Sequence, residues 1–140
     1  MIKILVIEDE VLLRANTVQI LAFEDFHTIE AENGLLGVQL AQEQLPDLIL
    51  CDVMMPELDG YGVLVALRQN PLTSAIPFIF TTAKASHADL RQGIELGADD
   101  FLSKPFSADE LLAAISTQLK KVVDLPGRGK YSEDTVSEFK

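Results

Sequence analysis

The sequence has 140 residues, 48% of them apolar and 24% charged, a balance that excludes an intrinsically disordered chain. With 11 basic and 22 acidic residues the net charge is −11, so we expect no direct nucleic-acid binding by this segment. The short early apolar run meets acidic residues 8–10 at once, which excludes a signal peptide, and no run is long enough to span a membrane. We therefore expect a soluble, cytoplasmic protein.

Short apolar segments rich in β-branched residues alternate along the chain with longer segments of helical periodicity. The expected strands are, in chain order, residues 3–7, 27–31, 47–51, 77–81 and 100–103. A helix is expected after each strand. This rhythm predicts an α/β fold, a doubly wound five-stranded parallel sheet with helices on both faces.

Several of the expected helices carry recognisable start signals. Asn33 precedes the second helix and Asp59 precedes the third. Ser107, followed three residues later by Glu110, predicts a capping box that opens the fifth helix. These residues therefore set the expected helix boundaries.

The fifth helix is the clearest amphipathic segment, and the chain changes character after it. The apolar face of this helix is expected to consist of Leu112, Ile115, Leu119 and Val122. We interpret residues 1–123 as one domain and residues 124–140, which contain few apolar side chains, as a C-terminal tail or linker. A frayed terminus and a hinge to a further domain both fit this tail.

Polar residues occur at the carboxyl ends of four expected strands. They are Glu8, Asp9, Asp52, Thr82 and Lys104. Because ligands of an open parallel sheet bind beyond the carboxyl ends of its strands, one pocket could hold them all. Three carboxylates this close would raise one another's pKa unless a cation lay among them. Mg²⁺ is the best candidate, since it accepts one or two carboxylates and leaves positions for phosphate oxygens.

These residue types together indicate phosphoryl transfer. A carboxylate beside Mg²⁺ can act as the nucleophile, and Asp52 is the expected acceptor. Lys104 is placed to neutralise the phosphoryl oxygens, and Thr82 can donate a hydrogen bond to them. Cys51 and the two histidines lack the spacing of a zinc or iron site, and Cys51 is expected to be buried.

Four segments together resemble the response-regulator receiver family of two-component signalling, which is CheY-like, across residues 2–123. The segments are ILVIEDE, LILCDVMMPELDG, FIFTTAKA and GADDFLSKPF. The resemblance implies the flavodoxin-like strand order 2-1-3-4-5 and a phosphodonor that is a sensor histidine kinase or a phosphotransfer protein. It also implies a phospho-switch and not an enzyme, with chemistry limited to its own phosphorylation and autodephosphorylation.

The resemblance assigns roles to further residues around the site. The metal would be held by Glu8, Asp9, Asp52 and the backbone carbonyl of Met54. Ala83 would join Thr82 and Lys104 at the phosphate. The peptide bond between Lys104 and Pro105 is expected to be cis, which orients the lysine.

The resemblance also implies an output surface made of the fourth helix, the fifth strand and the fifth helix. Phe101 would be its aromatic switch residue and would respond to a movement of Thr82. The charges of this surface are mixed, which suits a phosphorylation-dependent homodimer. Met54 and Lys84, two positions beyond Asp52 and Thr82, are expected to flank the attacking water and tune the lifetime of the phosphoryl group.

Three other functions fit the sequence less well. A phosphatase of the haloacid-dehalogenase type needs a second Asp two residues after its nucleophile, where this sequence has Met54. A flavodoxin-like FMN carrier needs a phosphate-binding loop after the first strand, where residues 8–10 are acidic. A pseudo-receiver that only binds partners would not need the complete set of site residues.

Overall fold

The structure, a computed structural model, describes residues 1–83 and 87–124. These residues divide into two compact units, the first comprising residues 1–104 and the second beginning at Pro105. The predictions for Lys84 and for most of the tail lie outside the described residues. Within the part of the chain that is described, no helix is long and apolar enough to cross a membrane.

Strands and helices alternate strictly along the chain. In order they are β1 (Lys3–Ile7), α1 (Val11–Phe23), β2 (His27–Ala31), α2 (Gly34–Gln44), β3 (Leu48–Asp52), α3 (Gly60–Gln69), β4 (Phe78–Thr82), α4 (His87–Glu95), β5 (Asp100–Ser103) and α5 (Ala108–Asp124). The α5 helix belongs to the second unit, and all the other elements belong to the first.

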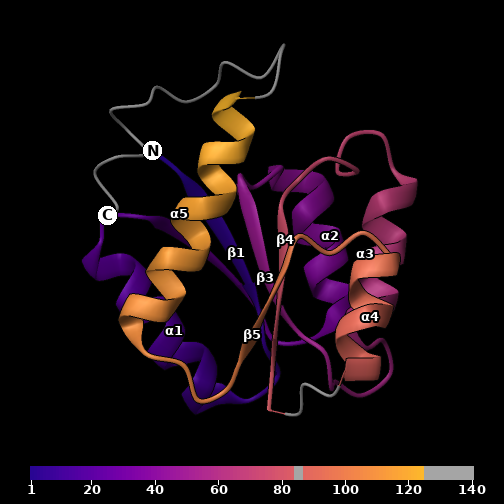
Figure 1. The fold of residues 1–140 in the computed structure, drawn as a ribbon, viewed down its shortest axis with the longest axis horizontal. Helices are drawn as coiled ribbons and strands as arrows, with labels where there is room; N and C mark the ends of the chain where they lie inside the picture. Colours follow the sequence, from indigo (N-terminus) through magenta and orange to yellow (C-terminus); the bar gives the residue numbers. More distant parts are fainter. Residues whose placement is uncertain (84–86, 125–140) are drawn as a thin grey trace. The chain divides into compact units, whose positions relative to one another are not determined.

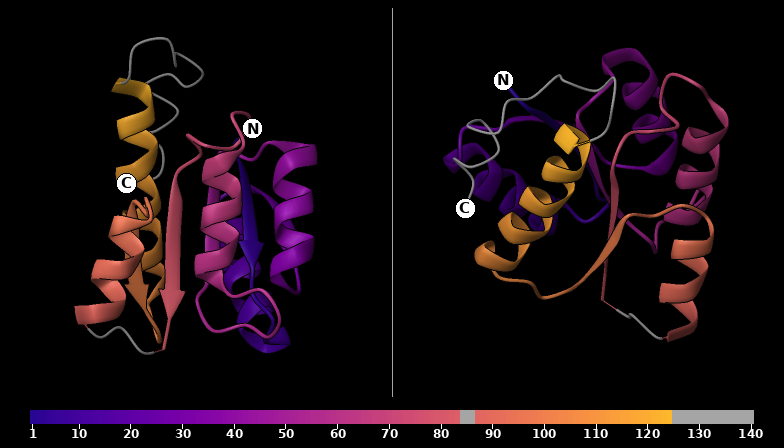
Figure 2. Two further views of the ribbon diagram at one scale, coloured as in Figure 1. Left: turned by 90° about the vertical axis from the view of Figure 1, so that its right-hand side faces the viewer. Right: turned by 45° about the horizontal axis from the view of Figure 1, so that its top comes forward.

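The five strands form one parallel sheet of order β2-β1-β3-β4-β5 (Figure 1), which confirms the expected fold. In the first unit α1 lies on one face of the sheet, and α2, α3 and α4 lie side by side on the other (Figures 1 and 2). Each helix of this unit connects two parallel strands. The carboxyl ends of the strands therefore meet at one edge of the sheet.

Two strands end one residue later than predicted. Asp52 pairs with Thr81 across β3 and β4, and Thr82 pairs with Ser103 across β4 and β5. Asp52 and Thr82 are therefore the last residues of their strands and not the first residues of loops. Because the strand ladder fixes their backbones, their side chains leave the sheet in defined directions.

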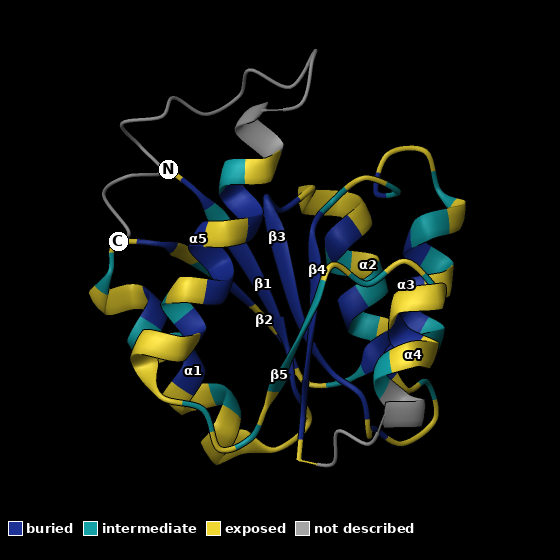
Figure 3. Ribbon diagram, in the orientation of Figure 1, coloured by how far each residue is buried: buried dark blue, intermediate teal, exposed yellow. Residues whose placement is uncertain are grey.

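The core of the first unit is built on the inner strands, which are buried on both faces, whereas β5 is partly exposed along its length (Figure 3). Phe80 lies at the centre of an aromatic cluster, with its ring centroid 5.0 Å from that of Phe78, 5.3 Å from Tyr61 and 5.1 Å from Phe101. Full burial, as found for Phe78 and Phe80, contributes roughly 1.5–3 kcal/mol per side chain to stability.

The predicted helix starts are confirmed by hydrogen bonds. Asn33 accepts one from the backbone N–H of Leu36 at 2.8 Å, and Asp59 accepts one from Gly62 at 2.9 Å. The capping box of α5 is present in both directions, at 3.0 Å to the Ser107 hydroxyl and 3.1 Å to the Glu110 carboxylate. These side chains satisfy backbone donors that a helix start leaves unpaired.

The buried face of α5 differs from the prediction at one position. Ile115 and Leu119 are fully buried as expected, but Leu111 and not Leu112 is the buried residue of the first turn. Both leucines are compatible with the helical period relative to Ile115, so the sequence pattern could not separate them. The side chain of Val122 lies outside the described residues.

Arg68, near the end of α3, fixes the turn between α4 and β5. Its guanidinium donates to the carbonyl of Gly97 at 2.8 Å and to that of Ile76 at 2.8 Å, and forms an ion pair of 3.2 Å with Asp99. Gly97 has a φ of +104°, a conformation that side-chain-bearing residues rarely adopt. This cluster lies at the amino ends of β4 and β5.

Candidate functional site

Three carboxylates meet at the carboxyl edge of the sheet. Glu8 and Asp9 follow β1, and Asp52 ends β3; one carboxylate oxygen from each lies within 4.8 Å of the others. Glu8 and Asp52 are buried, whereas Asp9 is exposed. We call these three residues the acidic cluster. The strand order places β1 beside β3, which is why residues so distant in sequence come together.

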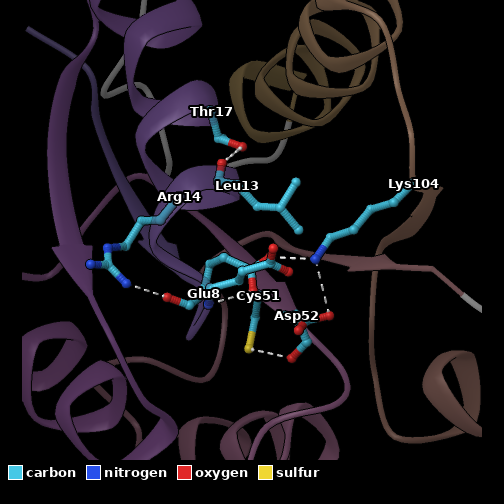
Figure 4. Close-up of polar contacts among 8 residues, drawn as sticks. Glu8, Leu13, Arg14, Thr17, Cys51, Asp52 and Lys104 are labelled. Carbon is cyan, nitrogen blue, oxygen red and sulfur yellow. Dashed lines mark hydrogen bonds and ion pairs between the residues drawn. The ribbon is translucent and has the colours of Figure 1, made fainter.

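Lys104, directly after β5, reaches the acidic cluster. Its ammonium group forms an ion pair with Glu8 and a second one of 3.4 Å with Oδ1 of Asp52 (Figure 4). The side chain is only 12% exposed, so the pairing takes place largely away from water. The backbone N–H of Lys104 donates to the carbonyl of Thr82 at 2.8 Å, which extends the pairing of β4 with β5.

The charge of Glu8 is disfavoured by its surroundings. Burial raises the pKa of this carboxyl above 4.5, and the nearby charge of Asp52 raises it further, although the hydrogen bond from Lys104 opposes both effects. One lysine faces three carboxylates, so it does not neutralise the acidic cluster fully. A small divalent cation would neutralise the acidic cluster. The three carboxylates are hard oxygen ligands, which fit Mg²⁺.

Of the residues expected to bind phosphate, Lys104 contacts this cluster, and the other two lie at the end of the strand next to β3. Thr82 is buried at the end of β4, and Ala83 beyond it is exposed. Met54, two residues after Asp52, has a side chain that is 72% exposed. The metal-binding role of its carbonyl and the cis form of the bond between Lys104 and Pro105 stay predictions.

Phe101, the expected switch residue, occupies a site between β4 and α4. Its half-buried ring packs against Phe80, and a Cβ atom added at Gly93 would lie 2.6 Å from its Cε2 atom. The missing side chain of Gly93 therefore provides the space in which the ring lies.

Two neighbours of Asp52 were not assigned to the site from the sequence. A Cβ atom at Gly60 would lie 2.3 Å from the carbonyl oxygen of Asp52, so α3 can begin this close to β3 only with glycine there. The fully buried thiol of Cys51 donates to the same carbonyl at 3.3 Å. Burial, with a smaller effect of the Asp52 charge, raises the pKa of Cys51 well above 9.0.

Arg14 on α1 contacts Glu8 and is a further residue of the site that sequence reasoning missed. Its Nη1 atom donates to the backbone carbonyl of Glu8 at 2.7 Å, and its Nε atom forms an ion pair of 3.3 Å with Glu30 on β2. The sequence offers one indication of its importance, since no other Lys or Arg occurs between Lys3 and Arg68.

The comparison with protein families gives one match. The family model described as response regulator receiver domain matches residues 4–116. A curated relative, the DNA-binding dual master transcriptional regulator RpaA of Synechocystis sp., is 35% identical over 94% of this chain and 54% of its own length. The probable transcriptional regulator ycf27 of Cyanophora paradoxa is 42% identical over 85% of this chain and 48% of its own. The chain thus spans about half the length of these relatives.

Solved structures with the same fold are also similar in sequence. The chemotaxis protein CheY4 of Vibrio cholerae is 26% identical with a TM-score of 0.81, over 84% of this chain and 98% of that chain. The receiver domain of the sensor histidine kinase PA1611 from Pseudomonas aeruginosa is 28% identical with a TM-score of 0.79, over 84% and 97%. That crystal structure is described with a magnesium ion coordinated in the active-site cleft.

Proposed function

Because the chain belongs to the response regulator receiver domain family of two-component signalling, we propose that Asp52 is its phosphoacceptor and that phosphorylation there switches its surface. The observation that carries this proposal is the position of Asp52. Asp52 is the last residue of a central strand. Its carboxylate lies beside two further carboxylates and is paired with Lys104. Such a carboxylate can attack a phosphoryl group while the surrounding charges stabilise the transition state.

The acidic cluster, together with the Met54 carbonyl, would hold Mg²⁺. When bound, the ion neutralises carboxylate charge and orients phosphoryl oxygens. The raised pKa of Glu8 is consistent with this assignment, since burial and the neighbouring Asp52 disfavour its charge and a bound cation would favour it. The magnesium ion described for the PA1611 receiver domain supports it by similarity.

The remaining site residues act on the phosphoryl group itself. As the group passes from the donor to a carboxylate oxygen of Asp52, Lys104 offsets the charge on its oxygens, and its ammonium already lies 3.4 Å from Asp52. The hydroxyl of Thr82 donates a hydrogen bond to the group. The donor would be a sensor histidine kinase or a phosphotransfer protein, and the chain would act in the cytoplasm.

The output of the switch would be read from α4 and β5. Thr82 gains its hydrogen bond by moving toward the phosphoryl group, and Phe101 on the neighbouring strand then moves into the space behind it. Such a switch shifts an existing equilibrium by about 1–3 kcal/mol. Participation of α5, and a phosphorylation-dependent homodimer, follow from the family resemblance and belong to the same proposal.

The relatives include DNA-binding regulators, but this chain spans only about half of their length. Its net charge of −11 opposes contact with phosphate backbones. A DNA-binding output would therefore require sequence beyond this segment.

The test is covalent modification by acetyl phosphate in the presence of Mg²⁺, followed by intact-mass measurement. We expect one phosphoryl adduct on the wild-type chain, none on Asp52→Asn and none after EDTA treatment. Asp25→Asn is the matched control, because Asp25 is exposed and Asn tolerates its φ of 63°. An adduct at wild-type level on Asp52→Asn would overturn the assignment.

A further inference from the structure

We propose that Arg14 is a positioning residue of the metal site, whose guanidinium fixes the main chain at Glu8 and thereby sets the affinity of the acidic cluster for Mg²⁺. This inference rests on the proposed function only in that the acidic cluster binds the ion. It assigns a role to a residue that does not touch the ion or the phosphoryl group.

The contact with Glu8 lies at the point where the strand ladder stops. The backbone N–H of Glu8 still donates to Ala31 of β2 at 3.0 Å, but β1 itself ends at Ile7. The carbonyl of Glu8 is instead bound by Arg14 at 2.7 Å, a short charge-assisted hydrogen bond. On the other side, the carboxylate of Glu8 pairs with Lys104 (Figure 4). Glu8 is thus held by one cation at its backbone and by another at its side chain.

Arg14 can impose this geometry because its own position is fixed. Its backbone N–H donates to the carbonyl of Glu10 at 3.0 Å in the first turn of α1, and its side chain is only 15% exposed. The ion pair with Glu30 connects the same guanidinium to β2. One side chain therefore joins the end of β1, the start of α1 and the neighbouring strand. Asp9 lies within the short segment that these contacts enclose.

Two effects of the guanidinium on Mg²⁺ affinity have opposite signs. As a positive charge beside the acidic cluster, Arg14 would repel a divalent cation, and its removal would tighten binding. As a group that holds Glu8 and Asp9 in position, it preorganises two of the three carboxylates, and its removal would weaken binding. A higher Kd for Mg²⁺ after removal of the guanidinium therefore indicates a positioning role, whereas a lower Kd indicates an effect of charge alone.

The experiment is a calorimetric Mg²⁺ titration of the full chain. We expect Arg14→Gln to raise the Kd for Mg²⁺ about tenfold, as is typical when a group that orients metal ligands is removed. Arg14→Lys keeps the charge but loses the planar fork, so it should raise Kd by a smaller factor. In phosphorylation by acetyl phosphate, the Mg²⁺ concentration for half-maximal rate should rise in parallel, while the rate at saturating Mg²⁺ stays close to that of the wild type.

Arg68→Gln is the matched control, because Arg68 also binds backbone carbonyls and one carboxylate. These contacts lie at the amino ends of β4 and β5, whereas the acidic cluster lies at the carboxyl edge of the sheet. The control should lower the melting temperature and leave the Kd for Mg²⁺ unchanged, so that a purely structural loss is recognised.

A Kd for Mg²⁺ that is unchanged or lower in Arg14→Gln would overturn the inference and leave the proposed function intact. If Arg14→Gln does not fold, the Kd of Arg14→Lys tests the inference instead. A Kd for Mg²⁺ equal to that of the wild type in Arg14→Lys would then overturn it. If the wild-type chain binds no Mg²⁺, the metal part of the proposed function fails, and this inference fails with it.

Discussion

At the scale of single residues, the site is a balance between burial and charge. Burial and the charge of Asp52 raise the pKa of Glu8, although Lys104 donates a hydrogen bond to its carboxylate. A site that binds a cation needs such excess negative charge, which costs stability until the cation arrives. Asp9, the exposed member of the acidic cluster, lies where water meets the site.

The first residue-scale prediction concerns pH. A carboxyl whose pKa is higher in the folded state binds more protons there, so its contribution to stability declines as the pH rises above 4.5, the unfolded value. In EDTA we expect Glu8→Gln to melt at a higher temperature than the wild type at neutral pH. The difference should vanish well below pH 4.5, where Glu8 is protonated in both states.

Thermal unfolding monitored by circular dichroism between acid and neutral pH measures this effect. Glu32→Gln is the control, because it removes one negative charge at an exposed position. A gain in Glu8→Gln that is the same at every pH, or that is matched by Glu32→Gln, would contradict an origin in the burial of Glu8.

The second residue-scale prediction concerns the lifetime of the phosphoryl group. Met54 carries a thioether that cannot orient an attacking water, so we expect the adduct on Asp52 to persist for minutes. Met54→Asn places a hydrogen-bonding amide at the same exposed position and should shorten the lifetime. Loss of the mass adduct with time gives the rate, and Leu72→Asn, another exposed apolar position, serves as the control. Decay of the wild-type adduct within seconds would refute the prediction.

At the scale of elements, the packing of β5 against α4 depends on an absent side chain. Glycine inside a helix costs about 1 kcal/mol relative to alanine, so Gly93 weakens α4 locally. In return the Phe101 ring packs where a Cβ atom would come within 2.6 Å of it. Gly93 therefore lowers the local stability of α4 but allows the Phe101 ring of β5 to pack against the helix.

This arrangement predicts coupling between Gly93 and Phe101 in a double-mutant cycle. Gly93→Ala should destabilise the chain when Phe101 is present, because the added methyl group displaces the ring. In a Phe101→Leu background the same change should cost less, since only the 3.1 Å approach to Phe80 remains to oppose the higher helix propensity of alanine. Urea denaturation measures both effects, and we expect a coupling free energy of about 0.5–3 kcal/mol. Equal effects of Gly93→Ala in the two backgrounds would show that the ring does not depend on Gly93.

Element boundaries also show what the sequence could and could not predict. The caps at Asn33, Asp59 and Ser107 are local and were found from residue types alone. The ends of β3 and β4 were placed one residue early, because a polar side chain was read as the end of a strand. Asp52 and Thr82 are held in the ladder by their neighbours, which is information that a single segment does not contain.

At the scale of the whole molecule, the pattern of alternating strands and helices was sufficient for the parallel sheet, and the family resemblance supplied its order. The acidic cluster was foreseen because carboxyl ends of parallel strands converge. Arg14 was not, since an isolated arginine on a helix is usually solvated and its bond to the Glu8 carbonyl exists only in the folded chain. Gly60 and Gly93 carry no chemistry and allow close packing instead, and the partners against which they pack are visible only in the folded chain.

The rate at which the single cysteine is alkylated measures how often the centre of the sheet opens. Cys51 is fully buried with a raised pKa, so an alkylating reagent can reach a reactive thiolate only when the centre of the sheet opens. Since Asp52 is the next residue, that opening should also break the metal site. At a free Mg²⁺ concentration ten times Kd, alkylation should then slow about elevenfold, while the chain unfolded in urea should react equally fast with or without Mg²⁺. If the alkylation rate of the native chain did not depend on Mg²⁺, the sheet would open around Cys51 with the acidic cluster still assembled.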